Sequence, residues 1–375
     1  MNMFLIDTHA TESLMFHNTA ADWDKSRERF EAWWHGDAID RPLLQVIAPK
    51  KDAPSNPPPA YSTLEEKWLD IDYRIRLFEW EMARTYYAGD AFPSPNTSIG
   101  PGTLSLYLGA KPGLHEDTVW YGKCVTDIPS AKPPIFNEDN PYWQFSLEFA
   151  REGIRRLSGH ALVSFPDLIE NLDTVSSLFG NRELLLALVD HPDKVHEFQE
   201  AILQLYFEHY DRLYEIIKDE HGGSCFSAFH IYGKGKIAKL QCDFSAMIST
   251  GMFEEFVAPY LVEQCRKLDH TVYHWDGPGA LQHEGPLLAI NELQAIQWTP
   301  GAGQPGVGDR MWWPLYHRIR KAGKSLMLNG VTPTEAQALV ENLGPEGLDL
   351  MVRISSVEEA DELVKQSFHW RMRGY

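Results

Sequence analysis

The chain has 375 residues, of which 43% are hydrophobic and 23% charged, an ordinary balance for a globular protein with a large core. Its formal net charge of −19 argues against a nucleic-acid or anionic-membrane surface. The N-terminal segment has no basic run ahead of an apolar one, so no signal peptide is expected. The four cysteines are widely spaced and form no CxxC motif, which predicts a reducing, cytoplasmic location.

The first part of the chain, residues 1–140, is predicted to form an N-terminal helical cap and the first elements of the fold. Apolar residues at helical spacing predict a helix over Trp23 to Trp34, followed by a short strand at 41–47. A long helix is expected over 64–87. The stretch 92–112 is rich in Pro, Gly and Ser and is expected to be a loop.

Residues 141–375 alternate between short apolar segments and amphipathic ones. Strands are expected at 161–165, 226–232, 237–242, 271–274, 295–298, 325–328 and 348–352. Helices are expected at 142–157, 181–188, 192–218, 252–268, 312–321, 334–343 and 357–365. This alternation is typical of parallel strands covered by helices, and it indicates one domain over residues 1–375.

Two folds share this pattern, an open doubly wound sheet and a (β/α)8 barrel. The positions of the polar residues favour the barrel, because they fall at or just after the carboxyl ends of strands, where such barrels carry their active sites. These residues are His230, Asp243, His274, Trp298, Asn329 and Arg353. The sequence therefore predicts a (β/α)8 TIM barrel with an N-terminal helical cap.

The segment His274-Trp275-Asp276-Gly277 is the main candidate site. His274 and Asp276 are two residues apart in a strand, so their side chains face the same side. An imidazole beside a carboxylate suits a metal ion or a proton-transfer pair. The alternative is a histidine that is simply held by a neighbouring acid. Trp275 is expected to face the helix layer, whereas Trp298 is expected to line the pocket.

Four further residues have both a functional and a structural interpretation. Asp243 either anchors substrate or acts as a base, or else caps the next helix. Cys242 is either a metal ligand or a small buried hydrophobe. Arg353 meets an anionic group of a substrate or a protein acid. Asn329 hydrogen-bonds substrate or marks a turn.

Several motifs together resemble the uroporphyrinogen decarboxylase and methylcobamide methyltransferase superfamily, in a bacterial branch, over roughly residues 25–367. Met252 to Tyr260 is similar to the family's helix (S/T)PexFeeFvlPy, and Leu328 to Pro333 is similar to its GNVDP segment. His274 to Gly277 falls where the methyltransferases carry a zinc-binding HxCG. Asp276 stands at the family's first cysteine position, and 351–355 lacks the second. The arginine-rich motif of the decarboxylases is not found.

The resemblance implies an enzyme that transfers a methyl or other one-carbon group, of the corrinoid-dependent type. His274, Asp276 and Asp243 would be catalytic, and His274, Asp276 and Cys242 would hold a divalent metal, with zinc as the candidate. His230, Trp298, Asn329 and Arg353 would bind a small-molecule substrate. A separate corrinoid protein is the implied partner, and a homo-oligomer is left open. The alternatives are a lyase or decarboxylase acting on a small acid, and a ligand-binding barrel without turnover.

Overall fold

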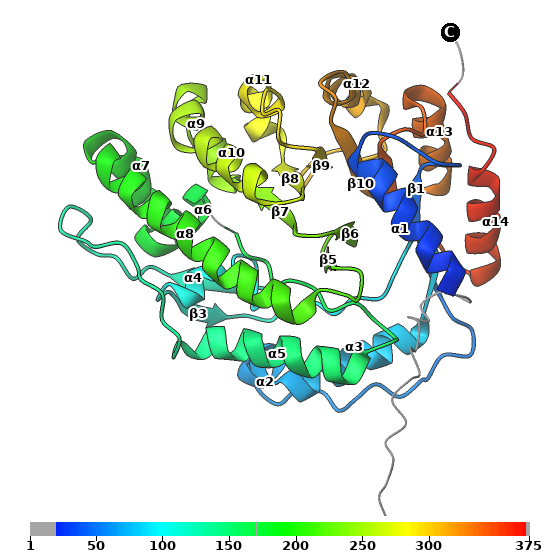
Figure 1. Ribbon diagram of the computed structural model, residues 1–375, viewed down its shortest axis with the longest axis horizontal. Helices are drawn as coiled ribbons and strands as arrows, with labels where there is room; N and C mark the ends of the chain where they lie inside the picture. The colour runs from blue at the N-terminus through cyan, green and yellow to red at the C-terminus, as the bar shows by residue number, and fades with distance from the viewer. Residues whose placement is uncertain (1–19, 170, 373–375) are drawn as a thin grey trace, which may run out of the picture.

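A computed structural model describes residues 20–169 and 171–372, so the expectation for residues 1–19 lies outside the described residues. The central feature is a seven-stranded sheet in the order β2-β1-β11-β10-β9-β8-β7, in which every neighbouring pair except β1 and β2 is parallel (Figure 1). Its strands are β1 (Leu43–Pro49), β2 (Thr85–Gly89), β7 (Ile237–Gln241), β8 (His270–Asp276), β9 (Ala295–Thr299), β10 (Ser325–Val331) and β11 (Leu348–Arg353). Two hairpins lie outside this sheet, β3 (Lys111–Leu114) with β4 (Val119–Gly122), and β5 (Gly223–Phe226) with β6 (Ile231–Lys234).

Helices follow the parallel strands and form an arc around the outside of the sheet (Figure 1). This arc consists of α9 (Thr250–Phe256), α10 (Ala258–Lys267), α11 (Glu284–Leu288), α12 (Trp313–Lys321), α13 (Pro333–Leu343) and α14 (Val357–Ser367). The other helices are α1 (Ala20–Trp34), α2 (Leu64–Leu69), α3 (Ile71–Arg84), α4 (Leu104–Tyr107), α5 (Pro141–Leu157), α6 (Asn171–Phe179), α7 (Asn181–Asp190) and α8 (Pro192–Ile217). Short 3-10 turns are η1 (Asp243–Met247), η2 (Pro278–His283) and η3 (Arg310–Trp312). The predicted mixed α/β architecture is confirmed, and within the described residues no helix is long and apolar enough to cross a membrane.

A complete eight-stranded barrel is not present, because the sheet does not close between β7 and β2 in the described residues. The expected strand at 161–165 is extended but has only isolated hydrogen bonds to its neighbours. The N–H of Leu162 donates to Pro93 O at 3.1 Å, and the N–H of Phe165 donates to Cys225 O at 3.1 Å. Pro93, Pro95 and Pro166 lack the N–H that a regular ladder needs, which accounts for the interruption.

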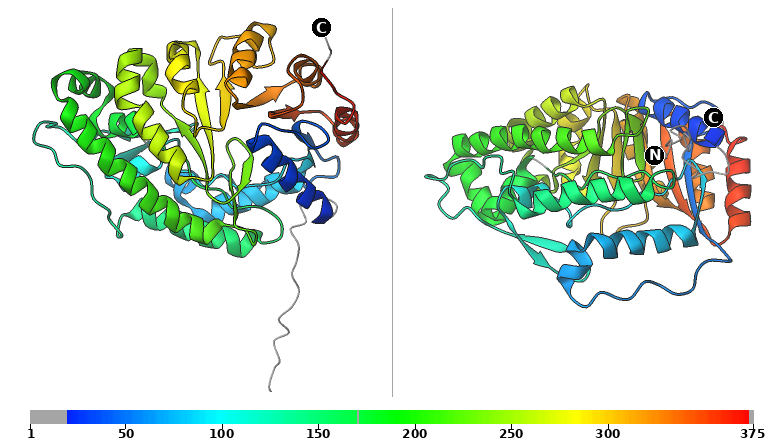
Figure 2. Two further views of the ribbon diagram at one scale, coloured as in Figure 1. Left: turned by 45° about the horizontal axis from the view of Figure 1, so that its top comes forward. Right: turned by 60° about the horizontal axis from the view of Figure 1, so that its bottom comes forward.

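The inner side of the sheet is filled by an apolar cluster, and α1 covers its amino-terminal end (Figure 2). The Trp34 indole N–H donates to Tyr232 O at 2.9 Å, and the ring stacks on His270 with centroids 5.0 Å apart. The hydroxyl of Ser325, at the start of β10, donates to Trp33 O at 2.5 Å. The predicted cap helix is thus confirmed, and its aromatic residues form part of the core.

Two expected helices are interrupted. The helix expected at 64–87 breaks at Asp70, whose carboxylate accepts from the Tyr73 N–H at 2.7 Å and caps α3. Its last residues belong to β2, since the run Thr85-Tyr86-Tyr87 consists of strand formers. The helix expected at 252–268 divides at Val257, directly before the Ala258-Pro259 start of α10.

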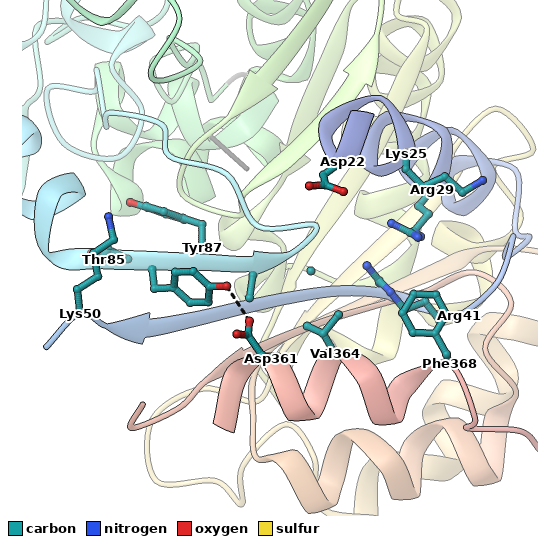
Figure 3. Close-up of a pocket in the computed structure, with 13 residues that line it drawn as sticks. Asp22, Lys25, Arg29, Arg41, Lys50, Thr85, Tyr87, Asp361, Val364 and Phe368 are labelled. Carbon is teal, nitrogen blue, oxygen red and sulfur yellow. Dashed lines mark hydrogen bonds between the residues drawn. The ribbon is translucent and has the colours of Figure 1, made fainter. Parts of the chain in front are cut away.

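A cavity of about 570 Å³ lies outside the site, along β2 between α1 and α14 (Figure 3). Tyr86 and Tyr87 are successive residues of β2, so their side chains point to opposite sides of the strand, and the Tyr86 hydroxyl donates to Asp361 Oδ1 at 2.6 Å. Arg29 and Arg41 also line this cavity, and both donate to the fully buried Asp90. Charge pairing inside the protein therefore accounts for both arginines.

Candidate functional site

Polar side chains from β7, β8 and β9 share one row on the inner side of the sheet. Gln241 is in register with His274, and His274 is in register with Gln297. One step further toward the carboxyl ends, Asp276 is in register with Thr299. Because side chains alternate sides along a strand, these residues all face the interior. They lie at the carboxyl ends of the strands, opposite the end that α1 covers.

Three residues at this end of the sheet could hold a metal ion: His274 and Asp276 of β8, and Asp243, which begins η1 just after β7. One ligand atom each from Asp243, His274 and Asp276 lie within 4.8 Å of one another. The predicted convergence of Asp243 with the His274–Asp276 pair is confirmed. Two carboxylates and one imidazole form a harder ligand set than the thiolates of a structural zinc site, and three protein ligands leave room for a further ligand.

Gln297 fixes the protonation of His274. Its amide N–H groups donate to Trp298 O and to the Thr299 hydroxyl, each at 3.0 Å, which turns its Oε1 toward His274 Nδ1. Because an amide oxygen only accepts, Nδ1 carries the proton. Burial lowers the pKa of His274, with a further contribution from the charge of Lys239, so the ring is neutral. Nε2 is then left with a free lone pair, the form that binds a metal or accepts a proton.

A second glutamine orients Asp243. The ammonium of Lys239 donates to Gln241 Oε1 and lies 2.6 Å from Asp167 Oδ1. Lysine can only donate, so the Gln241 amide nitrogen faces the other way and donates to Asp243 Oδ2 and Asp173 Oδ2, each at 3.1 Å. The Asp243 carboxylate is therefore held by a chain of hydrogen bonds that begins at a buried cation.

Asp173 adds a negative charge beside Asp243. Its carboxylate accepts from the backbone N–H of Asp243 at 2.9 Å and of Phe244 at 2.8 Å. Desolvation, followed by the charge of Asp173, raises the pKa of Asp243 to about 7. Asp276 contributes in the same direction, while Lys239 opposes it. A bound cation would relieve this repulsion.

Gly277 ends β8 with a turn that only glycine adopts readily, at a φ of +74°. Its N–H donates to Thr299 O at 2.8 Å. The glycine-rich run 301–306 lies alongside, since a Cβ on Gly301 would come within 3.6 Å of Gly277 Cα and 3.9 Å of Asp276 Oδ1. The loop after β9 thus approaches the site closely through its backbone.

A cavity of about 560 Å³ opens directly beside Asp243. Gln241, Asp243 and Asp173 form part of its lining, together with residues of the β4 strand, α6 and η1. Cavities of this size are typical of small-molecule sites. Of the three possible metal ligands, Asp243 is therefore the one that lines the cavity.

Two predicted site residues lie elsewhere. Trp298 is fully buried and packs against Trp275 and Trp312, with ring centroids 5.7 and 5.1 Å apart. It is in register with Trp275, so both rings face the helix layer, and the expectation that Trp298 lines the pocket is wrong. Cys242 is buried in the same apolar core and does not belong to the Asp243–His274–Asp276 group.

His230, Asn329 and Arg353 do not line the cavity and do not belong to the group of possible metal ligands. His230 adopts a φ of +52° in the turn before β6, and burial, followed by the charge of Arg353, lowers its pKa to about 4. The neighbouring Phe229 ring lies 5.2 Å from the His274 ring. Asn329 Oδ1 and His230 Nδ1 are buried without a hydrogen-bond partner in the described structure.

The residues that the sequence analysis did not identify are those that orient the ligands. Lys239, Gln241 and Asp243 are spaced two apart along Ile237-Ala238-Lys239-Leu240-Gln241-Cys242-Asp243. This is the spacing that identified His274 and Asp276, so a signal was present. Asp167 lies in the interrupted 161–168 segment and Asp173 lies in α6, and only the tertiary fold brings them near β7 and Asp243.

Comparison with protein-family models and with curated proteins finds no match to this chain.

Replacing Gln297 by leucine is expected to weaken binding of a divalent metal about 10- to 100-fold, because the His274 ring loses the partner that fixes its tautomer. Isothermal titration with zinc or manganese measures this change. The matched control is Gln337→Leu, which removes an exposed amide on α13. Wild-type affinity in Gln297→Leu would contradict the assigned role.

Proposed function

We propose that this protein is a metal-dependent enzyme that acts on a small molecule at the carboxyl ends of β7, β8 and β9. The observation that carries this proposal is the convergence of Asp243, His274 and Asp276, with ligand atoms within 4.8 Å of one another. Two of the three ligands are oriented or flanked by further polar groups: Gln297 for His274, and Gln241 and Asp173 for Asp243. Such supporting contacts are typical of functional metal sites.

We further propose that the fold is a distorted (β/α)8 barrel. The parallel sheet, the outer arc of helices and the position of the site at the carboxyl ends support this interpretation. The extended segments 91–98 and 161–168 would complete the wall between β2 and β7. Their isolated hydrogen bonds to each other and to β5 support that assignment.

The proposed reaction is the transfer of a methyl or other one-carbon group, as the resemblance of the motifs implies. A divalent metal, with zinc as the candidate, would supply a Lewis acid when bound. Asp243, His274 and Asp276 would hold it, while His230, Asn329 and Arg353 would meet polar groups of a substrate. A separate corrinoid protein is the proposed partner, and the cytoplasm is the proposed location. No disulfide joins the four cysteines, all of which lie in described parts of the chain.

Elemental analysis of protein purified without chelator tests the metal site. We expect close to one divalent metal per chain in the wild type, and its loss in His274→Ala and Asp276→Ala. His317→Ala, which removes an exposed histidine on α12, is the matched control and should retain the metal. Cys242→Ser should also retain it. Metal held stoichiometrically by both site variants would place the site elsewhere.

Proton transfer in a lyase or decarboxylase is the second candidate function. It is favoured by the neutral His274 next to two carboxylates, one of which has a pKa raised to about 7 mainly by desolvation. Groups that change protonation near neutral pH are suited to acid–base catalysis. If the wild type contains no metal even after incubation with zinc or manganese, this candidate replaces the first. A barrel that only binds a ligand would bind it without any conversion.

A further inference from the structure

We infer that the cavity beside Asp243 binds an uncharged organic molecule with an apolar body and one hydroxyl group, and that it discriminates against carboxylates and phosphates. This inference deepens the proposed function, on which it rests for the role of the metal. The cavity has a volume of about 560 Å³, room for a molecule larger than a single aromatic ring.

The charges in the lining oppose an anion. Asp173 and Asp243 are the acids of the lining, and Lys123 is its one basic residue. The Lys123 ammonium lies 2.9 Å from the Glu183 carboxylate, so its charge is already balanced. In the metal-free protein, a carboxylate in this cavity would therefore meet two acids and no unpaired cation of the lining. The two charges of a bound divalent metal would be balanced by Asp243 and Asp276, so Asp173 would still oppose an anion.

The nearest buried cation does not change this balance. Lys239 is paired with Asp167 at 2.6 Å and lies behind Gln241, whose amide separates it from Asp243. Lys239 does not line the cavity. An anionic ligand would thus gain no direct contact with the ammonium.

The walls supply apolar contacts. Tyr121, Ile169, Phe244 and Met247 line the cavity, and the Tyr121 hydroxyl is already used as a donor to Ile99 O at 2.7 Å. Met247 and Trp120, which also lines the cavity, are 46% and 66% exposed, so apolar surface of the lining is open to a ligand. An apolar or aromatic body would bury this surface.

The polar floor sets where the oxygen of the ligand would lie. Gln241 and Asp243 belong both to the cavity lining and to the ligand environment of the proposed metal. A hydroxyl can donate to the Asp243 carboxylate, whereas a carboxylate cannot. With a metal in place, the same neutral oxygen would complete its shell.

The test compares two ligands of nearly equal shape, 3-phenylpropan-1-ol and 3-phenylpropanoate, by isothermal titration on protein treated with EDTA. We expect the alcohol to bind at least about tenfold more tightly than the carboxylate, because only the carboxylate is repelled by Asp173 and Asp243. Ser176→Lys places an ammonium in the wall and should bring the carboxylate to at least equal affinity. Asp173→Asn should also lower the ratio of the alcohol's affinity to the carboxylate's affinity.

Asp190→Asn removes an exposed acid of α7 outside the lining and should leave the ratio unchanged. Equal or tighter binding of the carboxylate by the wild type, or no binding of the alcohol, would overturn the inference. A ratio unaffected by both Ser176→Lys and Asp173→Asn would place the ligand elsewhere. A separate titration with zinc tests the metal. If zinc does not bind, the proposed function fails, while the ratio measured without metal still decides the inference.

Discussion

Replacing Asp90 by alanine is expected to lower the free energy of unfolding by about 3–5 kcal/mol, because two buried arginines lose their common counter-ion. Asp90 is fully buried and accepts from Arg41 Nη2 at 3.0 Å and from Arg29 Nη1 at 3.2 Å. It also accepts from the Leu44 N–H at 3.0 Å. Burial alone would raise the pKa of Asp90, but the charge and hydrogen bonds of Arg41 outweigh it and lower the pKa.

Urea denaturation followed by circular dichroism measures this change. Asp40→Ala is the matched control, since Asp40 pairs with Arg29 at 2.8 Å but its side chain is 30% exposed. Water can solvate Arg29 on that side, so a smaller loss is expected. A loss below about 1 kcal/mol in Asp90→Ala would show that the two arginines find other partners.

Replacing Asp349 by asparagine is expected to stabilise the protein at neutral pH. Asp349 is fully buried on the inner side of β11, and burial raises its pKa well above the usual range. Gln45 Nε2 lies 3.1 Å from both carboxylate oxygens, and Gln45 Oε1 has no partner in the described residues. An asparagine keeps a neutral side chain at this position and can also donate to Gln45 Oε1.

The gain should depend on pH in a defined direction. Because the native state holds a proton on Asp349 that the unfolded chain releases above a pKa of about 4, stability falls as pH rises from there, at about 1.4 kcal/mol per pH unit. The asparagine variant lacks this dependence, so its advantage grows with pH for as long as native Asp349 stays protonated. Denaturation at several pH values measures the difference. Asp349→Leu separates the two causes, since it shares the pH effect but leaves Gln45 without a partner. An advantage that does not change with pH would contradict a protonated Asp349.

Local sequence patterns predicted the second half of the fold well. The strands β8 to β11 and the helices α12 and α13 were expected close to their observed positions, because each is a short apolar run or an amphipathic segment bounded by turn residues. The helices α6 and α11 were not expected. The single strand expected at 226–232 is wrong, because this stretch holds the end of β5, a turn and the start of β6. The break at Asp70 and the strand at Thr85–Gly89 were missed. The break depends on the cap that Asp70 forms, and the strand depends on pairing with β1. A closed eight-stranded barrel was also expected but is not observed, because prolines interrupt the segments that would pair between β7 and β2.

The site was predicted in part for similar reasons. The alternation rule placed His274 and Asp276 together correctly, and it applied equally to Trp275. It failed for Trp298 because the register between β8 and β9 decides which side Trp298 faces, and a single strand does not reveal that register. Gln297 gains its role through His274 on β8, and Lys239 gains its role partly through Asp167 in a distant segment. Residue type alone gave no indication of these partners, although the two-residue spacing of Lys239, Gln241 and Asp243 was visible in the sequence.

The position of α1 has a consequence for how the chain folds. Trp33 and Trp34, near the start of the chain, pack on residues as distant as Leu326, which lies 293 positions later than Trp33. The inner core can therefore be completed only after most of the chain has been synthesised. Contacts between such distant residues slow folding and leave apolar surface exposed in the meantime. A ribosome-bound chain that ends before β10 would lack Ser325 and Leu326, the partners of Trp33, and would leave that part of α1 uncovered.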